Sequence, residues 1–573
     1  MMSLSVLLLL LLLQACVPKG GGNNIVKGGG SAERSGDGDD PLAPFAWHLE
    51  NTGQTSFASS PGIAGQDMKI KPVIDSGIKG AGVRIAVSDS GVEIQHPDLY
   101  GNQLSGEHRN YSSTNSSAWR NADPYPQEEE SHGTAVSGLI AALGWNGIGS
   151  RGVAPSAKFA GFYFLGSHTG ETNASYEAKT LDQMTGNFDI YNYSYGYAGC
   201  AFFGESDSVL NAYKLGITNQ RGGKGAIYVK AAGNDYMGYL RECYGGTSSN
   251  PFLGNTNTSE DQAHPYLILV GAVNASGQRS SYSTPGSGLW VSAAGGEYGD
   301  AKPAMITTDI QGCSKGLSAS DSHVTNSFNR GRTNQNTYCN YTNGMNGTSS
   351  AAPVLSGIIA LMLEARPELT WRDVKHILAV TAEKINFSTT ILEHPGGPSA
   401  VTLGHVYDLN YTVNHAGFSF SNLYGFGRVN AEAAVNMAKT YSLGSMGGYT
   451  ESTWRDSGSL SLPIPDDSMT GVESTINFPQ NLKIESVQIR ITATHNYVGD
   501  LSVELTSPLG TTSRLLLGNS NLKDKNFQNQ MLLTNAFYGE PSNGDWKIKV
   551  VDTVSGDSGT LTNWKLKISG KIQ

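Results

Sequence analysis

Short apolar runs alternate with helical patterns along the first two thirds of the chain. Runs rich in β-branched and aromatic residues at 83–87, 158–163 and 226–230 predict buried strands. Apolar residues recur at helical spacing in 133–143 and in 351–364, where Pro353 would lie in the first helical turn. Strand–helix alternation is typical of a mostly parallel sheet with helices on both faces. We therefore predict a doubly wound α/β domain over residues 40–441.

The pattern changes after the glycine-rich segment 442–449. Apolar and polar residues now alternate over short stretches, at 486–491, 501–505, 546–551 and 564–568. Turns rich in Gly, Asp, Asn and Pro separate these stretches. An all-β sandwich is therefore predicted for residues 446–573.

The N-terminal apolar run, residues 1–15, is too short to span a bilayer and has the character of an export signal. It ends in Leu13-Gln14-Ala15-Cys16, which resembles a bacterial lipoprotein signal, with Cys16 as the lipidated first residue of the mature chain. Cleavage near Cys16 followed by free secretion is the alternative. Residues 16–39 are glycine-rich and predict a flexible tether. We expect an exported protein, either a cell-envelope lipoprotein of a Gram-negative outer membrane or a secreted one.

Composition narrows the partners. The net charge is −10 and only 15% of the 573 residues are charged, so the basic surface that nucleic-acid binding needs is not expected. Four cysteines remain beyond Cys16, an even number that predicts two disulfides in an exported protein, with three possible connectivities. They are too dispersed for a zinc site.

Four short motifs carry candidate chemistry. Asp89 ends a predicted strand, where α/β sheets place their sites, and His132 opens a predicted helix. Asn234 follows the strand at 226–230, and Ser349 stands just before the apolar run 351–364, at the opening of the predicted helix, where unpaired backbone N–H groups are available. Each motif alone has a structural explanation, as a turn, a cap or a surface residue. Together, in the order Asp, His, Asn, Ser, they predict a serine-protease triad with an oxyanion-binding asparagine.

The segments D-S-G-V-E-I-Q-H-P-D-L, S-H-G-T-A-V-S-G-L-I-A-A, A-A-G-N-D and N-G-T-S-S-A-A-P resemble those of subtilisin-like serine proteases. The resemblance spans about residues 40–440. It implies that Ser349 attacks the scissile carbonyl, that His132 is the general base, and that Asp89 orients the imidazole. It also implies that the side-chain amide of Asn234 donates to the oxyanion together with the backbone N–H of Ser349.

The second domain narrows the resemblance to one branch of that family. Residues 495–511, H-N-Y-V-G-D-L-S-V-E-L-T-S-P-L-G-T, look like part of the P domain that follows the catalytic domain of kexin- and furin-type convertases. Within this branch the chain is most similar to secreted bacterial kexin-like proteases of the Aeromonas type. The resemblance implies an all-β jelly-roll or sandwich P domain behind a subtilisin-like domain. A catalytically dead surface-binding protein is an alternative that the intact triad disfavours.

Substrate residues match the kexin pattern only in part. Ser194, Tyr195 and Gly196 resemble the strand that lines the S1 pocket, and Glu177 matches an acidic subsite position. Gly199, however, stands where kexins carry the acid that pairs with a P1 Lys or Arg. Cleavage after basic residues is therefore the leading hypothesis for substrates, and broad specificity is its alternative.

The resemblance also implies a calcium site, a disulfide pattern and a folding route. Hard oxygen donors suit Ca²⁺. The disulfide implied is Cys313–Cys339, which leaves Cys200 with Cys243. Only residues 16–39 precede the predicted domain, too few for a packed pro-segment, so we expect folding without an intramolecular chaperone, or with a separate partner. The calcium ligands implied are the carboxylates of Asp40 and Asp98, the side chain of Asn146, and the carbonyls of Leu143, Ile148 and Ser150.

Overall fold

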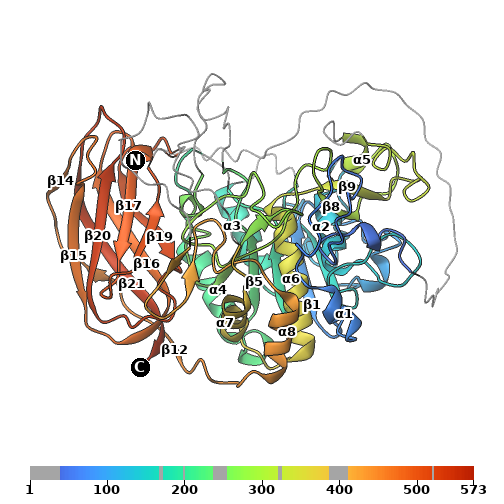
Figure 1. Ribbon diagram of the computed structural model, residues 1–573, viewed down its shortest axis with the longest axis horizontal. Helices are drawn as coiled ribbons and strands as arrows, with labels where there is room; N and C mark the ends of the chain where they lie inside the picture. The colour runs from blue at the N-terminus through green and yellow to red at the C-terminus, as the bar shows by residue number, and fades with distance from the viewer. Residues whose placement is uncertain are drawn as a thin grey trace.

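The computed structural model describes residues 39–573 except 129, 167–171, 198–199, 237–253, 321–325, 386–410, 519 and 521. Two units are visible in Figure 1, an α/β unit at the right and an all-β unit at the left. The last helix of the first unit ends at Thr440, and the first strand of the second begins at Tyr449. The predicted architecture, a mostly parallel α/β domain followed by an all-β domain, is confirmed.

A seven-stranded sheet forms the centre of the first unit, in the order β2-β3-β1-β4-β5-β6-β7. Every neighbouring pair in it is parallel. Parallel strands bring all their carboxyl ends to one edge, and this edge receives the candidate site. The strands are β1 (Arg84–Asp89), β2 (Arg109–Asn110), β3 (Lys158–Tyr163), β4 (Ile190–Tyr193), β5 (Ile227–Ala231), β6 (Leu267–Val273) and β7 (Val291–Ala294).

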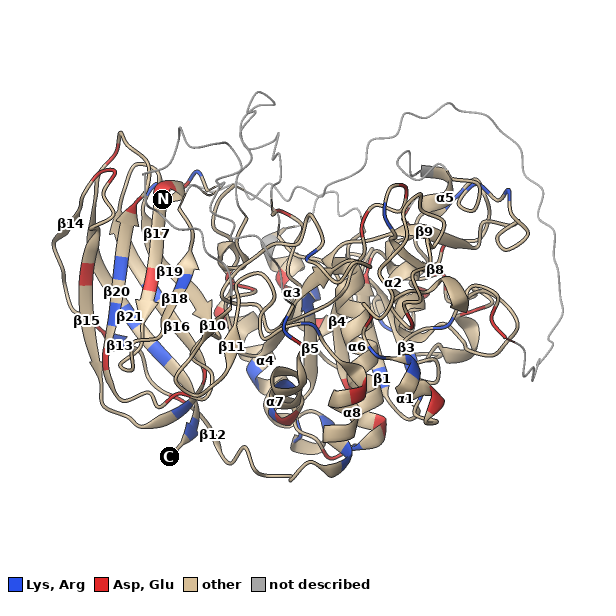
Figure 2. Cartoon of the chain, in the orientation of Figure 1, with Lys and Arg blue, Asp and Glu red and all other residues tan. Residues whose placement is uncertain are grey.

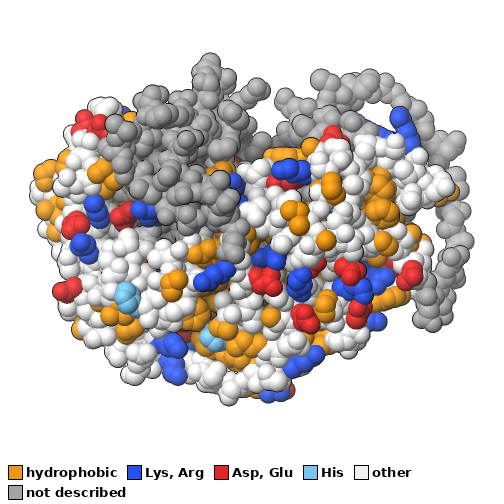
Figure 3. All heavy atoms as spheres, viewed as in Figure 1, with side chains coloured by type: hydrophobic (Ala, Val, Ile, Leu, Met, Phe, Trp, Pro, Cys, Tyr) orange, Lys and Arg blue, Asp and Glu red, His pale blue; other side chains and the backbone are white. Residues whose placement is uncertain are grey.

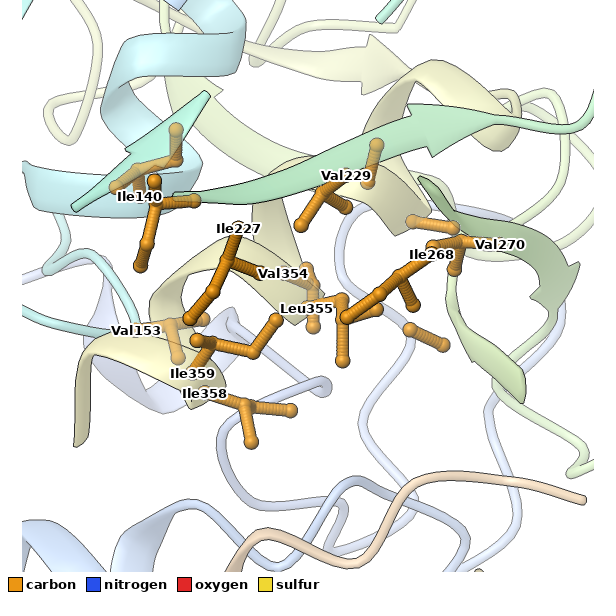
Figure 4. Packing of buried hydrophobic residues seen from close by; sticks show 14 of the residues in the cluster. Ile140, Val153, Ile227, Val229, Ile268, Val270, Val354, Leu355, Ile358 and Ile359 are labelled. Atoms are coloured by element: carbon orange, nitrogen blue, oxygen red, sulfur yellow. The ribbon is translucent and has the colours of Figure 1, made fainter. Parts of the chain in front are cut away.

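Helix α6 is the central helix of the core. Its Ile359 and Leu355 pack against Ile227 of β5 and Ile268 of β6 (Figure 4). α6 is also long and apolar enough to cross a membrane by composition, but 83% of it is buried inside the protein. The helices are α1 (Lys71–Asp75), α2 (His132–Ala141), α3 (Asn173–Gln183), α4 (Asp207–Asn219), α5 (Gly316–Ser320), α6 (Thr348–Ala365), α7 (Trp371–Thr381) and α8 (Ala431–Thr440).

Side chains alternate across the sheet, so each strand serves two layers. On β5, Ile227 and Val229 face α6, whereas Tyr228 packs its ring on Tyr213 of α4 at 4.9 Å between centroids. Short antiparallel pairs flank the sheet. They are β8 (Met305–Thr308) with β9 (Tyr341–Met345), and β10 (Thr412–Val413) with β11 (Ser419–Phe420).

The second unit is a sandwich of two antiparallel sheets. One has the order β12-β21-β16-β19 with β13 and β14 also paired to β21, and the other has the order β15-β20-β17-β18. Alternating apolar residues of both sheets, such as Ile489, Val503, Ile548 and Trp564, fill the space between them. The strands are β12 (Tyr449–Glu451), β13 (Arg455–Asp456), β14 (Leu462–Ile464), β15 (Val472–Phe478), β16 (Leu482–Thr494), β17 (Leu501–Thr506), β18 (Thr512–Leu516), β19 (Phe527–Thr534), β20 (Gly544–Asp552) and β21 (Gly559–Ile572).

The two units share a polar, well-bonded interface. Asn257 of the first unit is fully buried, and its Nδ2 donates to the carbonyl oxygens of Leu515 (3.0 Å) and Leu533 (3.1 Å) of the second. Arg372 of α7 pairs with Glu485 of β16 at 2.5 Å. These contacts join the two units through their main chains as well as their side chains.

Charged residues of both signs are spread over the two units (Figure 2). On the face shown in Figure 3, Lys and Arg side chains are interspersed with Asp and Glu, and neither sign covers a continuous area. Cys313 and Cys339, the pair that the resemblance implies, form a disulfide with an S–S distance of 2.05 Å. Cys243, the expected partner of Cys200, lies outside the described residues, as do Cys16 and the signal.

Candidate active site

Asp89 and His132 meet at the carboxyl edge of the sheet. Asp89 is the last residue of β1, and His132 is the first residue of α2, the helix that packs beside this strand. His132 Nδ1 lies 2.6 Å from Asp89 Oδ1, and the Asp89 side chain is fully buried. The contact requires Gly133, because a Cβ there would lie 2.1 Å from the carbonyl oxygen of Gly91.

The charge of Asp89 controls the protonation of His132. Desolvation favours the neutral imidazole, but the Asp89 carboxylate and its hydrogen bond outweigh this effect and raise the pKa of His132 above its ordinary value. The same hydrogen bond places a proton on Nδ1 of the neutral ring. His132 Nε2 is thereby left as the basic nitrogen.

Ser349 lies at the start of α6, beside the segment that follows β4. Its hydroxyl donates to the carbonyl oxygen of Ser194 at 3.0 Å, and no hydrogen bond joins it to His132. The Ser194 hydroxyl in turn donates to the carbonyl of Ser349 at 2.9 Å. Ser194 thus holds both the hydroxyl and the carbonyl oxygen of Ser349.

Pro353 explains why the Ser349 carbonyl is free to accept this bond. The helix begins at Thr348, three residues earlier than predicted, so Pro353 lies in the second turn and not in the first. Proline has no N–H to donate to the carbonyl four residues before it, which is that of Ser349. The Ser194 hydroxyl takes the vacant place.

Asn234 follows β5 and faces the same helix start. Its Oδ1 accepts from the backbone N–H of Thr348 at 2.9 Å and from the Thr348 hydroxyl at 3.0 Å. Because both bonds fix Oδ1, the amide Nδ2 is turned outward, and no described residue accepts a hydrogen bond from it. Gly347 has a φ of 96°, and a Cβ there would lie 3.2 Å from Asn234 Nδ2.

Two residues that the sequence analysis did not single out support this corner. The Thr348 hydroxyl also accepts from the N–H of Gly233 at 3.1 Å, so it ties Asn234 and its neighbour to α6. The Tyr282 hydroxyl accepts from the N–H of Gly347 at 2.7 Å. Thr348 stands directly before the predicted nucleophile, and that position is the signal that could have identified it.

The predicted substrate segment continues from β4. Asn192 and Ser194 face α6, whereas Tyr195 lies on the opposite side and donates to Gln183 at 2.9 Å. A Cβ on Gly196 would lie 3.1 Å from Nε2 of Gln262, a tight contact, so the glycine lets the main chain and this side-chain amide approach each other closely.

The predicted acidic subsite residue, Glu177, lies on α3 and accepts from the Ser206 hydroxyl at 2.9 Å. The adjacent Glu205 is largely desolvated, and burial together with the charge of Asp261 raises the pKa of Glu205 to about 7. Gly199 lies outside the described residues.

The six predicted calcium ligands come from three segments that meet beside α2. Asp40 accepts from the N–H groups of Trp145 (2.9 Å) and Asn146 (3.0 Å), and Asn146 Nδ2 donates to Asp98 Oδ1 at 2.7 Å. The N–H of Leu143 donates to the Asp98 carbonyl at 2.8 Å. The loop 143–150 therefore wraps around both carboxylates, and Ile148 and Ser150 lie within it.

The donor set at this loop suits a hard cation. Asp98 Oδ2 is buried without a well-formed hydrogen bond, although the Tyr341 hydroxyl and the backbone N–H of Ser150 lie near the Asp98 carboxylate, and the Ser150 hydroxyl is also unpaired. A buried, unpaired carboxylate oxygen is costly unless a cation meets it. Among the described residues, no group of three or more His, Cys, Asp and Glu side chains converges, so the donors here are two carboxylates plus neutral oxygens.

Known families match both units. Residues 80–427 match the subtilase family (peptidase S8), and residues 484–568 match the proprotein convertase P-domain. The Aeromonas extracellular serine protease of Aeromonas sobria is 33% identical over 92% of this chain and 86% of its own. Neuroendocrine convertase 2 of Homo sapiens is 28% identical over 93% of this chain and 74% of its own.

Solved structures agree with these matches. The Aeromonas sobria serine protease, solved in complex with its chaperone (ORF2), has a TM-score of 0.82 and 30% identity, and covers 95% of this chain and 97% of its own. A second crystal structure, of the serine protease of Aeromonas sobria, has a TM-score of 0.81 and 30% identity, and covers 94% of this chain and 97% of its own. The chain belongs to the subtilase family of serine endopeptidases and carries a convertase-type P domain behind its peptidase domain.

Proposed function

We propose that Ser349, His132 and Asp89 are the catalytic triad of this endopeptidase and that Asn234 binds the oxyanion. One observation carries the proposal. Strand β1, which ends in Asp89 and its bond to His132, pairs with β4, which leads to Ser194 and its two bonds to Ser349, and Asn234 bonds the same helix start through Thr348. A surface-binding protein without activity would not need either group in that state.

Peptide hydrolysis follows from the atoms. The substrate main chain pairs with the segment 194–196. A substrate N–H donates to the carbonyl oxygen of Ser194, which in the free enzyme accepts from the Ser349 hydroxyl. The Ser349 hydroxyl is thereby released. Ser349 Oγ then attacks the scissile carbonyl while His132 Nε2 takes its proton. The buried Asp89 carboxylate stabilises the resulting imidazolium.

The oxyanion that forms is met by two donors. These are Nδ2 of Asn234 and the backbone N–H of Ser349, which is among the unpaired N–H groups at the start of α6. His132 returns the proton to the leaving amine, and the acyl group stays on Ser349. Water then hydrolyses this acyl-enzyme by the same steps in reverse order.

A fluorophosphonate probe tests this assignment. The mature chain should be labelled at Ser349, as located by peptide mass spectrometry, and His132→Ala should abolish the labelling. Ser350→Ala serves as the matched control, because it changes the neighbouring hydroxyl only. Labelling that persists in Ser349→Ala would contradict the proposal.

Calcium is the second part of the proposed function. Asp40, Asp98 and the loop 143–150 would hold the ion, and the bound ion would neutralise the unpaired Asp98 oxygen and tie the N-terminal segment to α2. Because the ion binds only the folded chain, its removal should lower the thermal midpoint. Chelation should lower it in the wild type and have little effect in Asp98→Asn. Equal shifts in both proteins would exclude this site.

Export and folding form the third part. The apolar N-terminus and the extracellular relative support export, with a lipid on Cys16 as the membrane anchor and secretion as the alternative. Incorporation of labelled palmitate that is lost in Cys16→Ser tests the anchor. The chaperone complex of the Aeromonas sobria protease supports a separate folding partner here as well. Efficient refolding of the denatured chain alone would remove the need for one.

Specificity has two candidates. Glu177 and Glu205 near the substrate segment favour cleavage after basic residues, in keeping with the convertase relatives. Broad specificity is favoured by Lys230, because it already forms an ion pair with the nearby Asp261 at 3.0 Å. A peptide-library digest read by mass spectrometry separates the two, since broad specificity predicts no excess of Lys or Arg at P1.

A further inference from the structure

Strand β5 contains a charged residue where its sequence is otherwise apolar or aromatic. Lys230 stands between Val229 and Ala231, and only 3% of its side chain is exposed. Burying an ammonium group is costly unless a counter-ion meets it. The counter-ion is Asp261, whose Oδ2 lies 3.0 Å from Lys230 Nζ.

The pair lies against both segments that receive a substrate. The Lys230 ammonium is 4.6 Å from the ring centre of Tyr195, in the 194–196 segment, and Lys230 itself leads into the segment that carries Asn234. Neighbouring strands keep this register, since Lys230 pairs with Tyr193.

The residue after Asp261 closes the space between the two segments. Gln262 Nε2 donates to the carbonyl oxygen of Ala231 at 3.2 Å and lies 3.1 Å from the place where a Cβ on Gly196 would stand. A side chain that enters over Gly196 therefore moves towards the loop 259–262. Asp261 is the carboxylate of that loop nearest the buried lysine.

The two partners differ in access. The Asp261 side chain is 15% exposed, against 3% for Lys230, so the carboxylate is the more accessible member of the pair. Asp261 Oδ1 also accepts from the Ser259 hydroxyl at 2.5 Å. Desolvation opposes ionisation of Asp261, but the charge and hydrogen bond of Lys230 together with the Ser259 hydroxyl outweigh it and hold the pKa of Asp261 below its usual value.

We propose that Lys230 is a specificity-determining residue, which weakens recognition of basic P1 side chains by occupying Asp261 as an internal counter-ion. A P1 Lys or Arg has to compete with Lys230 for the carboxylate of Asp261. A neutral P1 side chain does not have to, because the charge of Asp261 is already balanced by Lys230. This inference rests on the proposed endopeptidase function and adds the residue pair that governs its P1 preference.

Two peptides that differ only in P1 arginine or citrulline test the inference, because citrulline has the shape of arginine without its charge. In Lys230→Met, the ratio of kcat/KM for arginine over citrulline should rise by about tenfold or more, as expected for a charged hydrogen bond gained by the substrate. In Asp261→Asn the unpaired lysine remains, and the ratio should fall below that of the wild type. A structural role alone would change both peptides equally.

The double variant Lys230→Met/Asp261→Asn removes both charges and should lose the gain seen in Lys230→Met. Lys375→Met is the matched control, because this buried lysine donates to the carbonyls of Pro265 and Leu267 and should not alter the ratio. An unchanged ratio in a folded Lys230→Met overturns the inference. If Lys230→Met does not fold, an unchanged ratio in Asp261→Asn overturns the inference. A wild-type enzyme that cleaves neither peptide contradicts the proposed function instead.

Discussion

Two asparagines of the peptidase domain use their amides in opposite ways. One lies at the carboxyl edge of the parallel sheet, beside Ser349 and the segment 194–196, which we call the substrate edge. The other lies at the interface between the two domains. Asn257 lies in the interface, where its Nδ2 donates to three oxygens and its Oδ1 accepts from the N–H of Leu533 at 2.8 Å. Asn234 lies at the substrate edge, where only Oδ1 is engaged. The amide of Asn257 is fully hydrogen-bonded within the protein, whereas that of Asn234 is fixed through Oδ1 and leaves Nδ2 available for a ligand.

The difference shows how the two regions are built. A buried polar group without a partner costs stability, so a polar group that serves structure is best fully paired, as Asn257 is at the interface. A group that must bind a transient charge has to be fixed in place and left unsatisfied until the substrate arrives. Unsatisfied groups at a well-supported position therefore indicate chemistry.

The largest effect should come from Ser349→Ala, which removes the proposed nucleophile. We expect kcat to fall by on the order of 10⁶, since triad members act as a unit. Ser350→Ala should keep its activity, because the Ser350 hydroxyl is buried without a hydrogen-bond partner and faces away from the substrate. Steady-state kinetics on one peptide measures both variants, and matching circular dichroism spectra exclude misfolding. A strong loss in Ser350→Ala would mean that the two serines have been assigned the wrong way round.

Asn234→Ala should have the next largest effect, with kcat lowered by a factor of about 10²–10³ and the thermal midpoint little changed. Thr348→Val sharpens the prediction, because it leaves Asn234 in place but removes one of the two bonds that orient its amide. It should lose less activity than Asn234→Ala, and Thr348→Ser should lose least. A fall in stability without a fall in kcat would place Asn234 with the structural asparagines.

The order of the four motifs along the chain could be predicted from sequence, as could the strand or helix that presents each one. Both are local properties, namely apolar periodicity and turn chemistry next to a reactive residue. The bond between Thr348 and Asn234 joins positions 114 apart, and only the packing of α6 against β5 brings them together. Helix α6 begins at Thr348, three residues before the apolar run 351–364, because apolar periodicity does not mark a polar first turn.

The pairing of Lys230 with Asp261 was also beyond the sequence. A lysine within an apolar strand is a visible signal that a counter-ion exists, but nothing local says which carboxylate supplies it. Sequence patterns thus locate the reacting groups, and the tertiary structure determines which groups hold them.

At the interface, Asn257→Ala should change stability and not catalysis. The variant leaves the N–H of Leu533 and the carbonyl of Leu515 buried without these partners, at a cost on the order of 3 kcal/mol in the free energy of unfolding. Urea unfolding measures this cost, and kcat/KM below the transition should stay near the wild-type value. Asn436→Ala, on the exposed face of α8, is the matched control and should be nearly neutral. Loss of activity in a folded Asn257→Ala would show that the interface also shapes the substrate edge.

The smallest effect should be a shift of pH dependence set by the Asp89–His132 pair. Protonated His132 cannot accept the proton of Ser349, so kcat/KM should fall as the pH falls through the pKa of His132, which Asp89 raises above its ordinary value. The stability linked to the same pair has the opposite sign. It is fully present below the unfolded pKa and is lost as the pH rises through the raised folded value. Asp89→Asn removes the charge, so its residual activity should keep an acid limb at lower pH than the wild type. An acid limb that does not move in this variant would mean that another group sets it, and the substrate edge would then lack the electrostatic coupling that distinguishes it from the interface.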